Sequence, residues 1–202
     1  MKISLQNLGK RFNREWIFRH FNFQFQETGA YAITGANGSG KSTLLQIIAG
    51  ALTHSEGSIH YNGELTIHSQ NAYQQIAIAA PYLELIEEMT ALEFLQFHSN
   101  FKKLSHSTDE ILAAVQLQNA AQKQIRYFSS GMKQRLKLAQ AFFSVSSILL
   151  LDEPTTNLDR DGVALYHQLI ELHRADRMLI ISSNVPEEYQ LCDEVIKMQD
   201  FK

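Results

Sequence analysis

A short glycine-rich segment holds the residues best suited to binding a phosphorylated ligand. It reads Gly35-Ala36-Asn37-Gly38-Ser39-Gly40-Lys41-Ser42-Thr43. This spacing of glycines, a lysine and a hydroxyl residue is that of a P-loop, whose backbone N–H groups point inward at phosphate oxygens while the next helix adds partial positive charge. Lys41 would reach the β- and γ-phosphates, and Ser42 would offer its hydroxyl to Mg²⁺. The segment therefore predicts a site for a nucleoside triphosphate.

The residues on either side of the segment supply the context that a P-loop requires. Tyr31 to Thr34 predicts a strand, and Thr43 to Ala49 predicts a helix. A strand before the loop and a helix after it distinguish a P-loop from a glycine-rich turn that matches by chance.

A pair of acids follows a short continuous apolar run. Residues 148–151 predict a central strand buried on both faces, and Asp152 and Glu153 come directly after it, followed by a Pro-Thr-Thr turn. Phosphoryl transfer needs a carboxylate for the metal and a group that orients the attacking water. Asp152 would hold Mg²⁺ directly or through water, and Glu153 would face the γ-phosphate and polarise the water. An Asp-Glu pair is common at strand ends, so the assignment depends on the P-loop upstream.

The N-terminal part is predicted to combine antiparallel strands with the strand that leads into the P-loop. Apolar and polar residues alternate over 3–5 and strictly over 21–26, which is the period of a half-buried strand. Asn62-Gly63 predicts a hairpin turn between strands at 58–61 and 64–67.

The later part of the chain shows helical spacing interrupted by one further buried strand. Residues 90–122 predict an inserted helical region, in which Lys102-Lys103 is expected to be a solvated face. A helix is predicted after Ser129-Ser130-Gly131, another over 163–172, and a buried strand over 178–181. The apolar face of the first of these helices comprises Met132, Leu136, Ala139 and Phe143.

Composition excludes several classes of protein. The chain has 202 residues, of which 45% are hydrophobic and 19% charged, as in a globular domain, and its net charge of −3 gives no general attraction to nucleic acid. Cys192 is the single cysteine, so no internal disulfide can form and a reducing cytosol is the expected setting. The N-terminus lacks the apolar core of a signal peptide, and no apolar run approaches the roughly 18 residues of a membrane span.

The histidines show no metal-ligand spacing. They are expected to be surface residues or to have hydrogen-bond partners, and include His60, His68, His98 and His106.

Together these segments resemble the ATP-binding subunit of an ABC transporter over nearly the whole chain. Residues 35–42 and 149–153 are similar to its Walker A and Walker B motifs. Phe128 to Met132 corresponds to its Leu-Ser-Gly-Gly-Gln signature, and Leu158-Asp159 to its D-loop.

The resemblance implies an α/β fold: a P-loop NTPase core of the ABC ATPase type, with an N-terminal antiparallel β sub-domain and an inserted helical sub-domain. The core would be about 1–85 and 146–202, and the helical sub-domain about 86–145. It also implies that ATP hydrolysis with Mg²⁺ powers transport through a separate integral membrane permease. The chain would then lie on the cytoplasmic face of the membrane, and no nucleic acid partner is expected.

In the family two chains pack head to tail, because one P-loop leaves the γ-phosphate open on one side. The resemblance implies that Ser129 Oγ, the Gly131 N–H and the start of their helix bind the γ-phosphate of the partner chain, and that Asp159 ties the two sites together. Ser129-Ser130 could alternatively be only the N-cap of the helix, and both roles are compatible. Phe12 occupies the place of an aromatic ring that stacks on adenine, with Trp16 as a nearby competitor.

The chain departs from the family pattern at two positions near the expected γ-phosphate. Tyr82 stands where the family has a glutamine that contacts Mg²⁺ or the water, and a phenol is bulkier than that amide. Asn184, or alternatively Ser183, stands where the family has a histidine. Asparagine can donate a hydrogen bond but cannot carry the proton. Tyr82 and Asn184 are therefore assigned with Glu153 to the catalytic groups.

The signature is also altered, at Ser130 and Met132. Because loss of one preorganised donor can slow a reaction by about 100- to 1,000-fold, we expect slow but measurable ATP hydrolysis that depends on Glu153. Two alternatives remain open: an ABC ATPase that acts without a permease, and a subunit that binds ATP and dimerises without turnover.

Overall fold

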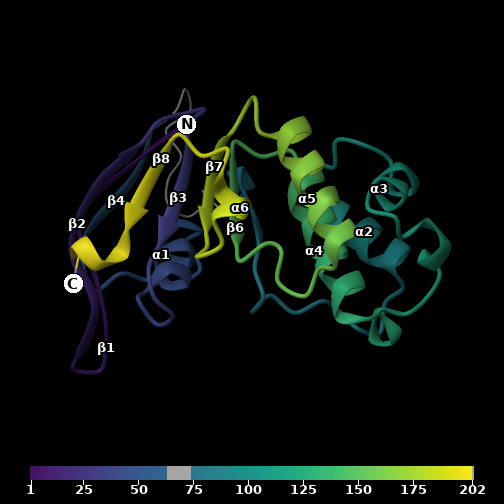
Figure 1. Ribbon diagram of the computed structural model, residues 1–202, viewed down its shortest axis with the longest axis horizontal. Coiled ribbons are helices and arrows are strands. Elements are labelled where there is room, and N and C mark those ends of the chain that lie inside the picture. Colours follow the sequence, from purple (N-terminus) through teal and green to yellow (C-terminus); the bar gives the residue numbers. More distant parts are fainter. Residues whose placement is uncertain (63–73, 202) are drawn as a thin grey trace.

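Two β-sheets and a group of helices make up the protein, and the computed structural model describes residues 1–62 and 74–201 (Figure 1). The first sheet is antiparallel, in the order β2-β1-β4, and consists of β1 (Lys2–Phe12), β2 (Glu15–Phe25) and β4 (Glu56–Asn62). Gly63 and the strand expected at 64–67 lie outside the described residues. The antiparallel strands predicted at 3–5, 21–26 and 58–61 are thus present.

Strand β2 is longer than the predicted strand because its alternation is interrupted. Ile3 pairs with Phe25 in the register of β1 and β2, and both side chains are fully buried, as the alternation predicts. The register shifts next to Phe21, at His20, where φ is 53°. Such a bulge breaks the two-residue period, so the sequence upstream of Phe21 does not read as part of the same strand.

The second sheet is parallel and separates two hydrophobic cores. Its order is β5-β6-β7-β3-β8, with β3 (Ala30–Thr34), β5 (Ile76–Ala79), β6 (Ile148–Asp152), β7 (Met178–Ser182) and β8 (Glu194–Lys197). Leu149 and Leu151 of β6 belong to one core, and Ile148 and Leu150 belong to the other. This double burial explains why β6 reads as a continuous apolar run.

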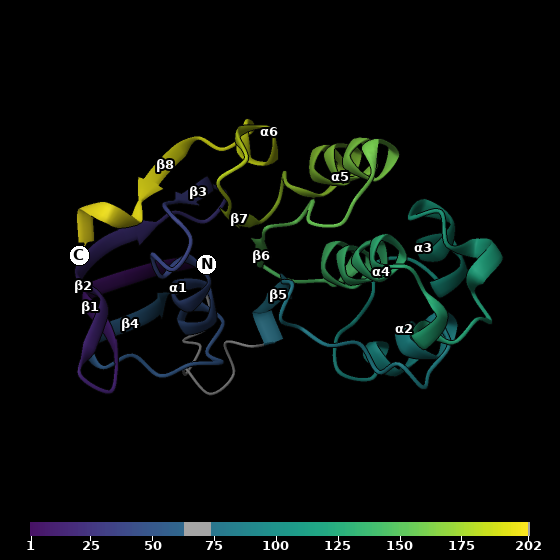
Figure 2. The same ribbon diagram turned by 60° about the horizontal axis from the view of Figure 1, so that its bottom comes forward.

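Different elements cover the two faces of the parallel sheet (Figure 2). Helix α1 (Lys41–Ile48) and the antiparallel sheet share the core on one face. Helices α4 (Ser130–Phe143) and α5 (Arg160–His173) pack on the other face, and α2 (Ala91–Ser99) and α3 (Thr108–Ala114) contribute to the same core beyond them. The expected α/β class and the expected N-terminal antiparallel strands are confirmed, and the structure adds that the second sheet is parallel.

Several helix starts are set by local hydrogen bonds. Thr90 with Glu93 forms a capping box at α2, and Ser107 with Glu110 forms one at α3. The predicted helical stretch at 90–122 is therefore two short helices with turns between them. The remaining short elements are α6 (Pro186–Tyr189) and the 3₁₀ helices η2 (Gln118–Ala120), η3 (Ile125–Tyr127) and η4 (Met198–Phe201).

Helix α4 is buried on more than the one predicted face. Leu136, Ala139 and Phe143 are buried as expected, but Gln134 and Leu138 are buried as well. Helices α2 to α4 occupy the range assigned to a helical sub-domain. That this range forms a sub-domain of its own stays a prediction.

The expectation that Lys102-Lys103 forms a solvated face is wrong for Lys102. Its ammonium donates a hydrogen bond to the carbonyl of Ile76 at the start of β5, and burial lowers the pKa of Lys102 to about 8. Lys103 is exposed as expected. A helical period gives no sign that one of two adjacent lysines turns inward to a strand end.

None of the helices within residues 1–62 and 74–201 is both long and apolar enough to span a bilayer.

Candidate active site

The predicted P-loop connects β3 to α1 at the carboxyl edge of the parallel sheet. It lines a cavity of about 310 Å³ whose walls are Ile17, Asn37, Gly38, Ser39, Gly40, Lys41, Ser42, Thr43 and Glu153. Gly40 has a φ of 101°, and a Cβ there would lie 2.6 Å from a methyl carbon of Ile17, so only glycine fits. Lys41 is 5% exposed, and its Nζ donates to the carbonyl of Gly35 at 2.7 Å. The P-loop is therefore folded as a phosphate-binding loop, and the Lys41 ammonium is held by a carbonyl of the same loop.

Asp152 presents a buried carboxylate beside this cradle. It ends β6, is 1% exposed, and its Oδ1 has no hydrogen-bond partner among the described residues. A buried carboxylate oxygen without a partner is costly, and a hard divalent cation would satisfy it. Together with the hydroxyl of Ser42, which lines the cavity, Asp152 is a donor set that fits Mg²⁺.

Glu153 reaches the cavity through an unusual backbone conformation. Its φ is 43°, in the left-handed region, and its N–H donates to the carbonyl of Ser182 at 2.8 Å. A left-handed backbone conformation is strained at a residue other than glycine, and such residues cluster at functional sites. In this conformation Glu153 lines the same cavity as the P-loop residues.

Asn184 contacts the P-loop directly. It follows β7, its Oδ1 accepts a hydrogen bond from the Gly35 N–H at 3.1 Å, and its Nδ2 donates to Asn37 Oδ1 at 3.5 Å. Ser183 is buried instead, and its hydroxyl accepts from the Val185 N–H. Of the two candidates, Asn184 is the one that the structure brings to the P-loop.

Tyr82 lies near Asp152, and the negative charge of that carboxylate disfavours ionisation of the phenol. Burial and the Asp152 carboxylate together raise the pKa of Tyr82 to about 12, while a hydrogen bond with Gln46 of α1 opposes the shift. The phenol is therefore protonated at neutral pH and can donate a hydrogen bond toward the metal side of the site.

A second cavity next to the P-loop is lined by Trp16 and not by Phe12. A cavity of about 440 Å³ adjoins the P-loop at Gly38 and is lined by residues 15–20 of β2. Within it the Trp16 ring lies 4.1 Å from the Arg19 guanidinium carbon. Phe12 is 47% exposed, lines neither cavity, and lies beneath the Lys10 ammonium. Of the two sequence candidates, Trp16 is the one that lines the cavity next to the P-loop.

The signature segment starts α4 and does not line the P-loop cavity. Ser129 is the N-cap of α4, and its Oγ accepts from the Met132 N–H at 3.2 Å, as in the capping alternative. A Cβ on Gly131 would lie 3.1 Å from the Asn157 carbonyl oxygen, so the helix start packs closely on the D-loop. Asp159 caps α5 through the Gly162 N–H and pairs with Arg135 at 3.1 Å. Within one chain these residues form a separate surface.

The comparison with protein families decides the assignment. The family described as ABC transporter matches residues 18–156. The chain belongs to this family. It is an ABC-type ATPase, as the resemblance of its motifs predicted.

Similar proteins agree with this assignment. The chain is 32% identical to the uncharacterised ABC transporter ATP-binding protein YybJ of Bacillus subtilis (strain 168), over 97% of this chain and 92% of that protein. It is 30% identical to the lantibiotic transport ATP-binding protein SrtF of Streptococcus pyogenes, over 93% and 82%. The fold is shared with the ATP-binding cassette MJ0796, solved as a dimer in a post-hydrolysis state with ADP and Pi (TM-score 0.85, 22% identity, 96% and 93% coverage).

Two buried polar residues of the ABC ATPase site were not anticipated from the sequence. Gln134 of α4 donates from Nε2 to the carbonyl of Pro154 at 2.8 Å, which joins the signature helix to the turn after Glu153. Glu188 of α6 is 4% exposed and accepts from Thr155. The amphipathic pattern of α4 gave no signal for Gln134, because this residue lies outside the predicted apolar face. The one-turn helix of Glu188 gives no periodic signal.

Proposed function

We propose that this ABC ATPase hydrolyses Mg²⁺-ATP to power transport through a separate membrane permease. The observation that carries the proposal is the placement of Glu153 on the wall of the same cavity as Lys41 and Ser42, beside the unpartnered carboxylate of Asp152. These are the phosphate cradle, the metal ligands and the water-orienting group that phosphoryl transfer requires.

Each residue has a distinct task in this proposal. The P-loop amides and Lys41 hold the β- and γ-phosphates, so Lys41 exchanges its Gly35 carbonyl for phosphate oxygens. Ser42 and Asp152 hold Mg²⁺, which when bound neutralises charge on the phosphates. Glu153 accepts a hydrogen bond from the attacking water and orients it toward the γ-phosphate. Trp16 offers its ring to the base.

The two departures from the family pattern limit the rate in this proposal. Asn184 uses both ends of its amide to hold the P-loop at Gly35 and Asn37, and it has no proton to exchange with the γ-phosphate. Tyr82 donates from a bulkier group than the family's glutamine. We therefore expect slow hydrolysis in which Glu153 is the main group acting on the water.

The proposed assembly contains two chains and a permease. Ser129 and Gly131 lie outside the P-loop cavity of their own chain, which suits a role in closing the site of a second chain. Asp159 keeps its two contacts within the chain and stabilises the D-loop at that interface. The likeness to an ATP-binding protein of lantibiotic transport supports a permease partner at the cytoplasmic face of the membrane. The net charge of −3 gives the chain no general attraction to nucleic acid.

Phosphate release by a Glu153→Gln variant tests the catalytic part. The exchange keeps the size of the side chain but removes the carboxylate that orients water, so we expect release to fall by about 100-fold or more while ATP binding is kept. Glu171→Gln, at an exposed position of α5, is the matched control and should hydrolyse like the unaltered chain. Equal rates for Glu153→Gln and the unaltered chain would support the binding-only alternative.

Co-purification from detergent-solubilised membranes tests the transport part. An integral membrane protein with many spans should come with the tagged chain. Recovery of the chain without any membrane protein, together with normal hydrolysis, would support an ABC ATPase that acts without a permease.

A further inference from the structure

Glu188 lies close to the proposed site, and among the described residues the hydrogen bonds of its buried carboxylate all come from one residue, Thr155. It lies on α6, which follows Asn184, and is 4% exposed. Its Oε1 accepts hydrogen bonds from the Thr155 N–H at 2.8 Å and from the Thr155 hydroxyl. Its Oε2 has no partner among the described residues.

This arrangement is costly for the fold taken alone. A buried carboxylate is poorly solvated, and within the described residues no lysine, arginine or histidine pairs with Glu188 to compensate its charge. An ionised acceptor does, however, make stronger and shorter hydrogen bonds than a neutral one. The carboxylate therefore fixes Thr155 more firmly than an amide in its place would.

Thr155 is part of the turn that sets the backbone of Glu153. The Thr156 N–H donates to the Glu153 carbonyl at 3.1 Å, and the Glu153 N–H donates to the Ser182 carbonyl at 2.8 Å. The segment after β6 is thus attached at two points, to the end of β7 through Glu153 and to α6 through the contact of Thr155 with Glu188. A left-handed φ such as that of Glu153 persists only where the surroundings enforce it.

We propose that Glu188 is a positioning residue for ATP hydrolysis: by holding Thr155, its carboxylate keeps the strained turn in which Glu153 points at the γ-phosphate. The inference rests on the proposed role of Glu153. It predicts an effect on turnover and little effect on nucleotide binding, because the P-loop and Lys41 are attached to β3 and α1 and, among the described residues, share no hydrogen bond with Glu188.

Steady-state hydrolysis by Glu188→Gln and Thr155→Val tests this inference. Both variants should lower kcat by roughly 10-fold, since small displacements of a catalytic group are felt strongly in the rate. The KM for ATP should stay within about two-fold. Because the two changes weaken the same contact, their effects should not multiply, and the double variant should be scarcely slower than either single variant.

Tyr166→Phe is the matched control. The Tyr166 hydroxyl donates to the backbone carbonyl of Glu188 at 2.7 Å, so its loss loosens α6 and lowers the melting temperature without touching the carboxylate. Its kcat should stay near that of the unaltered chain. Should Glu188→Gln fail to fold, Thr155→Val examines the same contact from a partly exposed residue.

Three outcomes would overturn the inference: an unchanged kcat in both Thr155→Val and Glu188→Gln, a fall in kcat for Tyr166→Phe as large as for Glu188→Gln, or effects that multiply in the double variant. Glu153→Gln distinguishes failure of the proposed function from failure of the positioning role of Glu188. If it hydrolyses normally, the proposed function fails. If it is inactive while Glu188→Gln is normal, the positioning role of Glu188 alone fails.

Discussion

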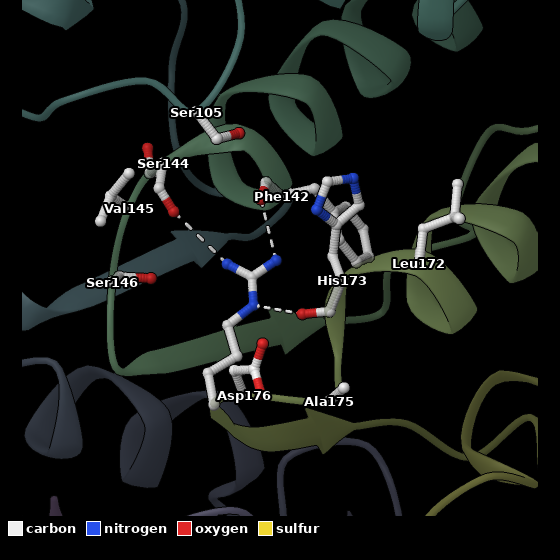
Figure 3. A pocket seen from close by; sticks show the side chains of 10 residues that line it. Ser105, Phe142, Ser144, Val145, Ser146, Leu172, His173, Ala175 and Asp176 are labelled. Carbon is white, nitrogen blue, oxygen red and sulfur yellow. Dashed lines mark hydrogen bonds between the residues drawn. The ribbon is translucent and has the colours of Figure 1, made fainter.

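Polar side chains are buried at the carboxyl ends of the parallel strands (the carboxyl edge) and at their amino ends (the amino edge). The two edges differ in whether these side chains have hydrogen-bond partners. At the carboxyl edge, Asp152 Oδ1 and the Ser182 hydroxyl are buried at strand ends and have no hydrogen-bond partner within residues 1–62 and 74–201. At the amino edge, Arg177 directly precedes β7 and lines a cavity of about 290 Å³, yet its guanidinium is engaged on several sides (Figure 3).

Arg177 joins the ends of two helices. It donates to the carbonyls of Phe142 at 2.8 Å and Ser144 at 3.4 Å at the end of α4, and to that of His173 at 2.6 Å at the end of α5. The C-termini of helices carry partial negative charge, so two of them together offset a buried cation. Burial lowers the pKa of Arg177 to about 10, which still leaves it charged at neutral pH.

The comparison teaches that burial alone does not mark a functional group. At the amino edge the guanidinium of Arg177 is satisfied within the chain and supports the fold, whereas at the carboxyl edge Asp152 keeps an oxygen free for a bound cation. Cavities of similar size lie at both edges, so the state of the polar groups and not the volume distinguishes the two.

The largest expected effect comes from Asp152→Asn at the carboxyl edge. Hydrolysis should fall by about 100- to 1,000-fold because the metal ligand is lost, while the melting temperature without nucleotide should stay equal or rise, since an unpaired buried charge is removed. Phosphate release and thermal melting measure both. Asp161→Asn, at an exposed position of α5, is the control. A clear fall in melting temperature would mean that Asp152 supports the apo fold, contrary to the comparison.

Arg177→Met at the amino edge should have the opposite profile. It leaves helix-terminal carbonyls of α4 and α5 without their donor, so the free energy of unfolding should drop by about 2–4 kcal/mol. The kcat of the folded protein should not change. Chemical denaturation should show a much smaller loss for Arg174→Met, whose guanidinium is exposed and bonds only the Leu191 carbonyl among the described residues. Equal losses in the two variants would remove the special role of Arg177.

The smallest expected effect concerns pH and the same edge. The His173 ring lies among Phe142, Phe143 and His106, and burial, with smaller contributions from Arg177 and His106, lowers the pKa of His173 to about 4 from the 6.5 of an unperturbed ring. Between these values the unfolded chain binds more protons than the folded chain, so stability decreases as pH falls from about 6.5 to about 4.

For a partly exposed ring this loss is about 1–2 kcal/mol, after a discount for solvent screening. Urea midpoints measured from about pH 7 to about pH 4.5 should therefore decline, and His173→Phe should decline less steeply. His98, whose pKa burial also lowers to about 4, adds to the slope in both proteins. Parallel curves for the variant and the unaltered chain would show that His173 does not titrate as expected.

Much of the fold could be predicted because its signals are local. The P-loop, its strand and helix, and the acids after β6 are contiguous in the sequence, and the α/β class and the family that they indicated are confirmed. The roles of the individual site residues stay predictions. Phe12 was preferred over Trp16 because of its position in the chain. The place of each ring, however, depends on the course of the β1–β2 hairpin. The bulge at His20 alters that course, and the hydrophobic period of the sequence gives no sign of it.

Contacts between distant segments could not be predicted. Glu188 with Thr155, Gln134 with Pro154 and Lys102 with Ile76 join elements that the order along the chain keeps apart. Hydrophobic period tells which face of an element is buried but not which distant backbone group meets a polar side chain there. Asn184 illustrates the same limit: its position was assigned, but its bond to the Gly35 N–H comes from the pairing of β3 with β7.

The place of β3 in the sheet has a consequence for synthesis on the ribosome. Its two neighbours, β7 and β8, are made after nearly everything else in the described chain, since β3 spans Ala30–Thr34 while β7 begins at Met178 and β8 at Glu194. Until they emerge, the apolar strand that carries the P-loop has no hydrogen-bonded partner on either side. Long-range parallel pairing of this kind is slow to form and leaves strand edges exposed. We therefore expect the nascent chain to expose this strand until β7 and β8 have been made, and nucleotide to stabilise the P-loop only after that point.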